Sequence, residues 1–162
     1  MRAIRSRRLA LTIWIDADAC PAPVKTIVFR ASQRTGVPVV LVANHRAQTP
    51  PSPLVTAVQV GQGFDAADDH IARHSSAGDL VVTADIPLAA RLVARGVTAL
   101  DPRGELYTAD NVRERLALRD LKEELRGAGQ LSGGPAPYRD RDKQAFANGL
   151  DRWLARRRAG AP

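Results

Sequence analysis

Aspartates stand at points where apolar segments of the sequence end. Asp16 and Asp18 follow the run LTIWI, and Asp85 follows VVTA. A charged side chain is costly at the end of a buried strand unless a partner or a function holds it there. In open parallel sheets the working crevice lies beyond the carboxyl ends of the strands. We therefore expect these three carboxylates to meet at one edge of a sheet.

A predicted helix that begins near residue 65 adds further carboxylates. On a wheel of about 100° per residue, Asp68 falls in the middle of the apolar stripe, with Asp69 on its shoulder. A carboxylate there needs a partner or a raised pKa, and no Lys or Arg precedes it within two turns of that helix. Mg²⁺ or Mn²⁺ is the partner that we expect. The candidate metal ligands are Asp16, Asp18, Asp68, Asp69 and Asp85.

The chemistry that needs such a site is phosphodiester hydrolysis, in which a metal lowers the pKa of a water and aims it at phosphorus. We take Asp16, Asp18, Asp68 and Asp85 as the candidate catalytic residues. Structural interpretations remain open for each of them. Asp85 precedes Ile86-Pro87 and would suit a helix N-cap, whereas acids near the start of a helix complement its dipole.

Short apolar runs that alternate with helical patterns must position these residues. The runs with strand character are 11–17, 37–43, 55–60, 79–84 and 97–100, and the predicted helices are 21–36, 65–78, 85–96, 109–127 and 140–158. This alternation predicts a three-layer α/β/α fold around a mostly parallel sheet of about five strands, with added C-terminal helices. DPRGELYT, between the fifth strand and the next helix, reads as a turn with a short hairpin.

Positive charge is concentrated at the two ends of the chain. The formal net charge is +7, with four arginines in residues 1–8 and seven basic against three acidic residues in 139–158. We divide the chain into a basic extension (1–10), an α/β domain (11–126) and a Gly/Pro-rich linker with a basic amphipathic helix (127–162). Basic ends on a neutral body suit nucleic acid as a partner, although solubilising ends would look the same.

The sequence also excludes several classes of protein. Its single cysteine, Cys20, rules out an intrachain disulfide and a multi-cysteine zinc site, and we expect a structural thiol there. The apolar run near the N-terminus is short for a secretion signal, and no run approaches the roughly 18 residues of a membrane span. We expect a cytoplasmic protein with no membrane partner. The apolar stripe of the last helix leaves a homodimer open.

Five segments together are similar to one bacterial family. IDADACP, DAADDHIA, GDLVVTADIPLA, RGELYT and GGPAPYRDRDKQAFANGLDRWL resemble the YaiI/YqxD family, whose function is unassigned, over about residues 12–156. That family in turn looks like a relative of PIN-domain nucleases. The resemblance implies a PIN-like fold, with metal-binding acids at Asp16, Asp68 and Asp85 and a hydroxyl at Thr83. The further glutamate that PIN domains usually carry on an earlier helix is missing here, and Asp18 is the candidate to replace it.

Other polar residues are candidates for contact with a substrate. Asn44 and His45 follow the second strand and face the same predicted edge. Cations near the linker and on the late helices would contact phosphates, namely Arg103, Arg119, Arg139, Arg141 and Lys143. His70 and His74 lie one turn apart, but we interpret them as surface residues because no third metal ligand is in register.

Three functions remain open from the sequence. The first is a metal-dependent nuclease, which we expect to act on RNA. The second is a nucleic-acid-binding or regulatory module without catalysis. The third is a phosphatase of the haloacid dehalogenase type, because DADAC resembles its D-x-D motif. Asp79, which that interpretation would use, should lie at the wrong end of the sheet.

Overall fold

The computed structural model describes residues 11–63, 65–134 and 136–158, so the predicted basic extension of residues 1–10 lies outside the described residues. It contains a six-stranded sheet in the order β3-β2-β1-β4-β5-β6. The strands are β1 (Ile13–Asp16), β2 (Val39–Ala43), β3 (Val55–Gln59), β4 (Leu80–Val82), β5 (Thr98–Leu100) and β6 (Leu106–Tyr107). The first five are parallel, and β6 pairs antiparallel with β5, which forms the hairpin expected for DPRGELYT.

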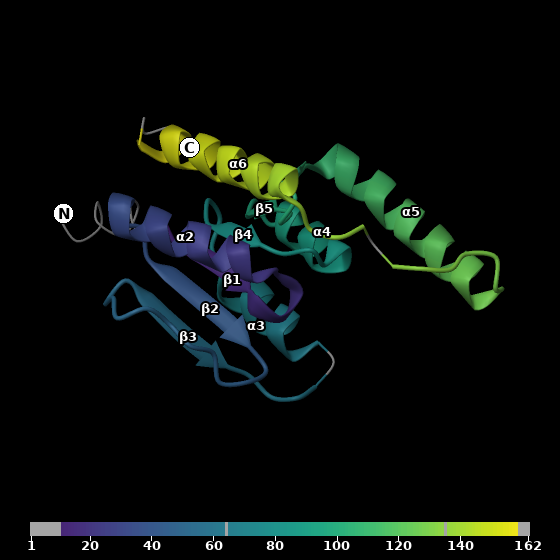
Figure 1. The fold of residues 1–162 in the computed structure, drawn as a ribbon, viewed down its shortest axis with the longest axis horizontal. Coiled ribbons are helices and arrows are strands. Elements are labelled where there is room, and N and C mark those ends of the chain that lie inside the picture. Colours follow the sequence, from purple (N-terminus) through teal and green to yellow (C-terminus); the bar gives the residue numbers. More distant parts are fainter. Residues whose placement is uncertain (1–10, 64, 135, 159–162) are drawn as a thin grey trace.

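Helices cover both faces of the sheet. They are α2 (Ala22–Thr35), α3 (Ala66–His74), α4 (Ile86–Ala94), α5 (Ala109–Gly127) and α6 (Asp140–Arg158), with a 3-10 turn at Ala17–Ala19. Because strand side chains alternate, Ile13 and Ile15 join the core under α2 and α6, whereas Trp14 joins the core under α3 and α4. Figure 1 shows these layers. The predicted three-layer α/β/α fold with a mostly parallel sheet is confirmed.

Local sequence signals set the ends of the helices that flank the site. Asp85 caps α4, since its side chain accepts from the backbone N–H of Leu88 at 2.9 Å. Thr108 and Asn111 form a reciprocal capping box that starts α5. Gly36 ends α2 in the left-handed region, with φ of 79°.

The first predicted strand is shorter than expected. The apolar run predicted a strand over residues 11–17, but β1 ends at Asp16 and the backbone turns at once into the 3-10 turn. This turn comes before Pro21, which lacks an N–H for a sheet hydrogen bond and directly precedes α2. The side chains of Asp16 and Asp18 therefore do not share one face of a continuing strand.

Helix α6 returns to the body of the protein and seals one face of the sheet. Its residues Phe146, Leu150 and Leu154 are buried in the core with β1 and α2. The apolar stripe that left a homodimer open is thus covered within this chain. None of the described helices is long and apolar enough to cross a membrane.

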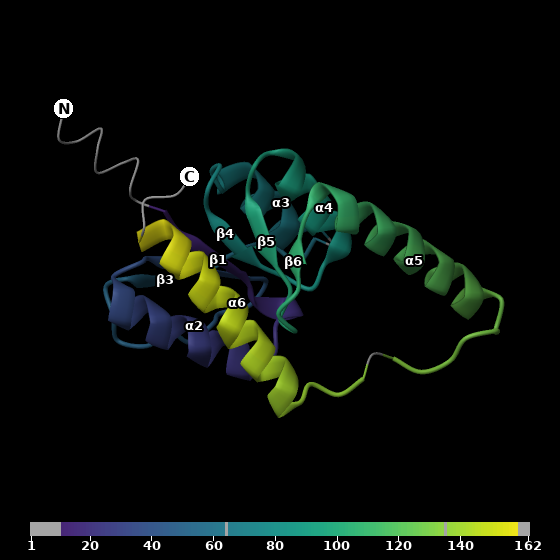
Figure 2. The ribbon, with the colours of Figure 1, turned by 90° about the horizontal axis from the view of Figure 1, so that it is seen from above.

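Helix α5 is placed differently. It starts against α4, where Val112 is buried, and its C-terminal half extends away from the sheet (Figures 1 and 2). Leu118 and Leu121 in that half are 42% and 50% exposed. The linker that follows α5 leads back to α6, so the C-terminal half of α5 projects from the side of the domain.

Candidate functional site

A hydrogen-bonded hydroxyl joins two of the predicted carboxylates. Thr83 directly follows β4, which pairs in parallel with β1, and its Oγ1 donates to Asp16 Oδ2 at 2.8 Å. The same Oγ1 accepts the backbone N–H of Asp85 at 3.0 Å. Thr83 is fully buried and Asp16 is 4% exposed. One buried hydroxyl therefore fixes Asp16 and the start of α4 relative to each other.

Asp68 completes a group of three carboxylates from three elements. It lies half-buried in the first turn of α3, on the side that carries the buried Ile71 and Ala72. Its carboxyl group lies close enough to those of Asp85 and Asp16 for both to raise its pKa. Of the carboxylates expected at this edge, the structure brings Asp16, Asp68 and Asp85 near one another.

The electrostatics show how unfavourable this grouping is without a cation. The pKa of Asp16 is raised to about 6. Burial is the largest cause, the Thr83 hydrogen bond opposes it, and the charges of Asp85 and Asp18 add to the rise. Burial also raises the pKa of Asp68, with added contributions from the charge of Asp85 and that of Asp16. Near neutral pH these groups hold protons more readily than ordinary aspartates.

Two of the predicted metal ligands point elsewhere. Asp18 is exposed on the 3-10 turn, where Oδ2 accepts the backbone N–H of Asn44 at 2.9 Å and Oδ1 lies 3.1 Å from His45 Nδ1. Asp69 pairs with Arg91 on α4 at 2.9 Å. Both carboxylates have protein partners outside the group of three, so their roles as metal ligands stay predictions.

The donor set has the chemistry of a site for a hard cation, because it consists of carboxylate oxygens that repel one another. As placed, one oxygen of Asp16 accepts a hydrogen bond from the Thr83 hydroxyl, and one oxygen of Asp85 accepts from the N–H of Leu88. Among the described residues, no group of three or more His, Cys, Asp or Glu side chains is gathered closely enough to hold a metal ion. The residue types fit a divalent cation, whereas the side chains would have to draw together around it.

The predicted phosphate contacts are spread over two regions. Arg103 ties the hairpin to α6, since it pairs with Asp142 at 2.9 Å, also donates to the carbonyl of Ala136, and its guanidinium lies 5.8 Å from the centre of the Tyr138 ring. Arg139, Arg141 and Lys143 are exposed at the start of α6. Arg119 lies on α5, beside α4. Their contact with a substrate stays a prediction.

Two further acids, the buried Asp79 and the half-buried Asp101, have structural roles that the sequence did not reveal. Asp79 accepts from the backbone N–H of Thr12 and Ser76 and from Trp14 Nε1, at 2.9 to 3.1 Å. Asp79 therefore holds together the chain at the edge of the sheet opposite Thr83, the edge expected from its position before β4. Asp101 follows β5 and accepts from Arg103 N and Tyr107 Oη, which closes the hairpin. An aspartate directly after an apolar strand was the available signal for Asp101.

The remaining reactive side chains are also engaged. Cys20 Sγ donates to the carbonyl of Val82 at 3.5 Å, and burial raises the pKa of its thiol, which suits the structural role predicted for it. His70 and His74 stack with ring centres 4.2 Å apart, and His74 Nδ1 lies 2.9 Å from the carbonyl of His70. Within the part of the chain that the structure describes, no hydrogen bond or ion pair joins either histidine to Asp16, Asp68 or Asp85.

Comparison with known proteins places the chain in a family. A family model described as "Uncharacterized BCR, YaiI/YqxD family" matches residues 14–156. The UPF0178 proteins of Bordetella avium and Psychromonas ingrahamii are each 60% identical to the chain, over 92% and 89% of its length and 97% and 95% of their own. No solved structure was found to match it. The chain, with its edge of three carboxylates, belongs to the YaiI/YqxD family.

Proposed function

We propose that the protein is a divalent-metal-dependent nuclease that hydrolyses phosphodiester bonds, with RNA as its substrate and with Asp16, Asp68 and Asp85 as the centre of the site. The observation that carries this proposal is the forced approach of three carboxylates from β1, α3 and α4, around a buried Thr83 hydroxyl. Keeping these carboxylates together destabilises the folded state, since burial and mutual repulsion both disfavour their charged forms. A site that binds Mg²⁺ or Mn²⁺ explains why that cost is borne.

The three side chains would have different tasks. Asp16 is oriented by Thr83 and has a second oxygen with no protein donor among the described residues. Asp85 is oriented by the N–H of Leu88. Asp68, whose pKa is raised, is suited to give up or take a proton near neutral pH. When bound, a divalent cation would supply a water of lowered pKa and stabilise charge on the phosphate.

The test is cleavage of structured and single-stranded RNA in the presence of Mn²⁺. Asp16→Asn should reduce the rate by about 100-fold or more, since even residues that only support metal ligands are worth about 10- to 100-fold. Asp151→Asn, an exposed aspartate of α6 paired with Arg34, serves as the control and should cleave like the wild type. Equal rates in wild type and Asp16→Asn would show that another site, or a contaminant, cleaves.

A second candidate function is nucleic-acid binding without catalysis. It is favoured by the absence, among the described residues, of a cluster that could hold a metal ion as placed, and by the cations that line α5. Binding of RNA by the wild type with no turnover, across substrates and metals, would select this function. The phosphatase alternative loses the support of Asp79, whose oxygens are engaged at the opposite edge.

A further inference from the structure

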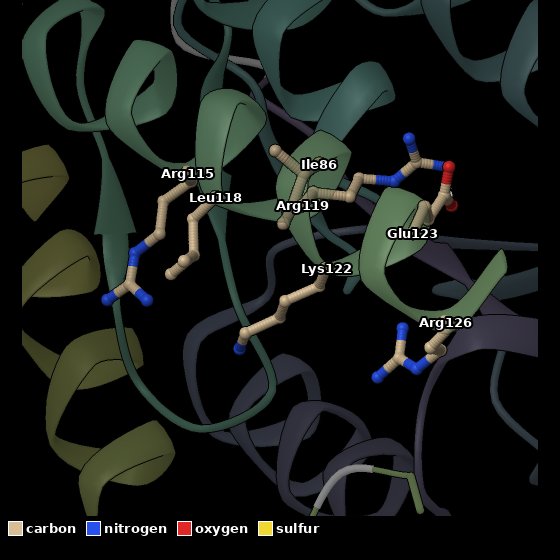
Figure 3. Close-up of a pocket in the computed structure, with 7 residues that line it drawn as sticks. All are labelled: Ile86, Arg115, Leu118, Arg119, Lys122, Glu123 and Arg126. Carbon is tan, nitrogen blue, oxygen red and sulfur yellow. Dashed lines mark ion pairs between the residues drawn. The ribbon is translucent and has the colours of Figure 1, made fainter. Parts of the chain in front are cut away.

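A pocket of about 260 Å³ lies between α5 and the start of α4. We call it the α5 groove, and Figure 3 shows its side chains. It is lined by Ile86, Arg115, Leu118, Arg119, Lys122, Glu123 and Arg126. Four of these seven residues are basic, which is unusual in a helix whose acids and bases are equal in number over residues 109–127.

The sequence of α5 places four of its five cations on one side, and the fifth, Arg113, lies on the far side near Asp110. Arg115, Arg119, Lys122 and Arg126 are spaced by four, three and four residues, so at about 100° per residue they fall within a sector of about 60°. Of the acids in α5, Glu123 lies beside this sector, and the other four lie on the far side of the wheel. The charges of α5 are therefore segregated although its total is neutral.

Two of these four cations have acid partners, whereas the two nearest the C-terminus of α5 do not. Arg119 pairs with Glu123 at 3.0 Å, and Arg115 pairs with Glu105. In the described part of the chain, neither Lys122 nor Arg126 has an ion pair. The outer half of the groove thus offers positive charge that the protein itself does not neutralise.

One end of α4 connects the groove to the carboxylate site. Ile86, which lines the groove, is the residue directly after Asp85. From Arg115 to Arg126 the helix rises about 16 Å, at about 1.5 Å per residue. That length matches about four or five phosphates of a strand that keeps the helical spacing of about 3.4 Å along its axis, and fewer phosphates of an extended strand. Leu118 is 42% exposed among the cations and adds an apolar surface that a base or ribose could cover.

We propose that the α5 groove binds the phosphodiester backbone of a single nucleic-acid strand and leads that strand to Asp85. The proposal rests on the proposed function, because it names how the substrate of that same site is held. A strand suits the groove better than an isolated phosphate does, since the cations are drawn out along about three turns of helix rather than gathered at one point. Lys122 and Arg126 would make phosphate contacts, and Leu118 would lie against a base or ribose.

Fluorescence anisotropy with a labelled single-stranded RNA of about 12 nucleotides tests this directly. The full chain is used in excess EDTA, so that no divalent cation contributes. The variant Lys122→Ala/Arg126→Ala is compared with Arg152→Ala/Arg156→Ala, which removes the same charge from exposed positions on α6. We expect the α5 variant to bind about tenfold more weakly and the α6 variant to bind within about twofold of wild type. Two lost contacts should also reduce the salt slope by about 1.4, at about 0.7 per phosphate on single strands.

Other outcomes overturn the proposal. Equal weakening by both double variants would mean that net charge alone attracts the strand, and an unchanged affinity of the α5 variant would place binding elsewhere. Circular dichroism of each variant checks that the exposed substitutions leave the fold intact. Binding by Asp16→Asn separates the two proposals. If Asp16→Asn and the wild type both bind RNA through α5 but neither cleaves it, the groove proposal stands and the nuclease proposal fails. If the wild type cleaves RNA and the α5 variant binds and cleaves it equally well, the groove proposal fails and the nuclease proposal stands.

Discussion

Thr83 Oγ1 lies 2.8 Å from Asp16 Oδ2, at a point where β4 has just ended and β1 is ending. The same oxygen lies 3.0 Å from the backbone nitrogen of Asp85, so it donates to one acidic residue and accepts from the next. All of this takes place around a fully buried hydroxyl. The candidate site is therefore built into the parallel pairing of two central strands and does not depend on a loop.

Replacing Thr83 by Val keeps the shape of the side chain but removes that hydroxyl. Asp16 Oδ2 and the N–H of Asp85 then lose a buried partner, which should lower the free energy of unfolding by about 1–3 kcal/mol. Urea unfolding measures the change. Thr83→Ser retains the hydroxyl and should lose only the contribution of a methyl group, about 1 kcal/mol. A Val variant as stable as wild type would show that the hydrogen bonds contribute nothing.

Metal-free protein should become more stable when Asp16 is replaced by Asn. The pKa of Asp16 is raised to about 6 in the folded protein from 3.8, so the folded state binds more protons and stability falls as pH rises through that window. Above this pH window the loss of stability is constant, and a pKa shift of about two units corresponds to a loss of at most about 3 kcal/mol. Asparagine carries no charge and still accepts from Thr83.

Thermal unfolding at about pH 8 and about pH 3.5 tests the sign of this effect. Asp16→Asn should exceed wild type at the higher pH and match it at the lower one, where both residues are neutral. Asp151→Asn, which is exposed, should show no such difference between the two pH values. An Asp16→Asn variant that is destabilised equally at both pH values would mean that the charge of Asp16 does not lower the stability of the folded protein.

Gly104 is a place where α6 closely approaches the hairpin. A Cβ at this position would lie 2.6 Å from the backbone of Ala145, and its φ of 94° already disfavours other residues. Gly104→Ala should therefore displace the start of α6 and lower stability. Gly129→Ala is the matched control, because its φ is 76° and nothing lies within 4 Å of the added atom.

Chemical denaturation of the two alanine variants separates backbone strain from the clash. We expect strain alone, about 1 kcal/mol, in Gly129→Ala and a clearly greater loss, about 2–4 kcal/mol, in Gly104→Ala. Equal losses would show that α6 gives way without cost at Ala145.

The sequence was sufficient to predict the sheet and its carboxylates for physical reasons. Apolar strands separated by helical patterns indicate a parallel sheet, and acids at strand ends then fall on one edge. Asp68 was found because a helix has a fixed period, which places it on the buried side of α3. Each of these inferences uses only local spacing.

What the sequence missed depends on tertiary contacts. The 3-10 turn after Asp16 directs Asp18 toward Asn44, far along the chain, so no local pattern reveals it. The apolar stripe of α6 predicted a buried face but not what would cover it, and the core of the same chain does so. The sequence also could not show that the cations of α5 form a groove with Ile86, because that depends on how α5 packs beside α4.

Calorimetric titration of Mn²⁺ into the metal-free protein tests the carboxylate site most directly. The comparison is with Asp16→Asn/Asp85→Asn, whose two new amide side chains can still cap α4 and still accept from Thr83. We expect the wild type to bind one or two ions with micromolar affinity at about pH 7.5, more weakly at about pH 5 because protons compete for Asp16, and the double variant not to bind. Failure of the wild type to bind, or equal affinity in the double variant, would contradict a cation site formed by Asp16, Asp68 and Asp85.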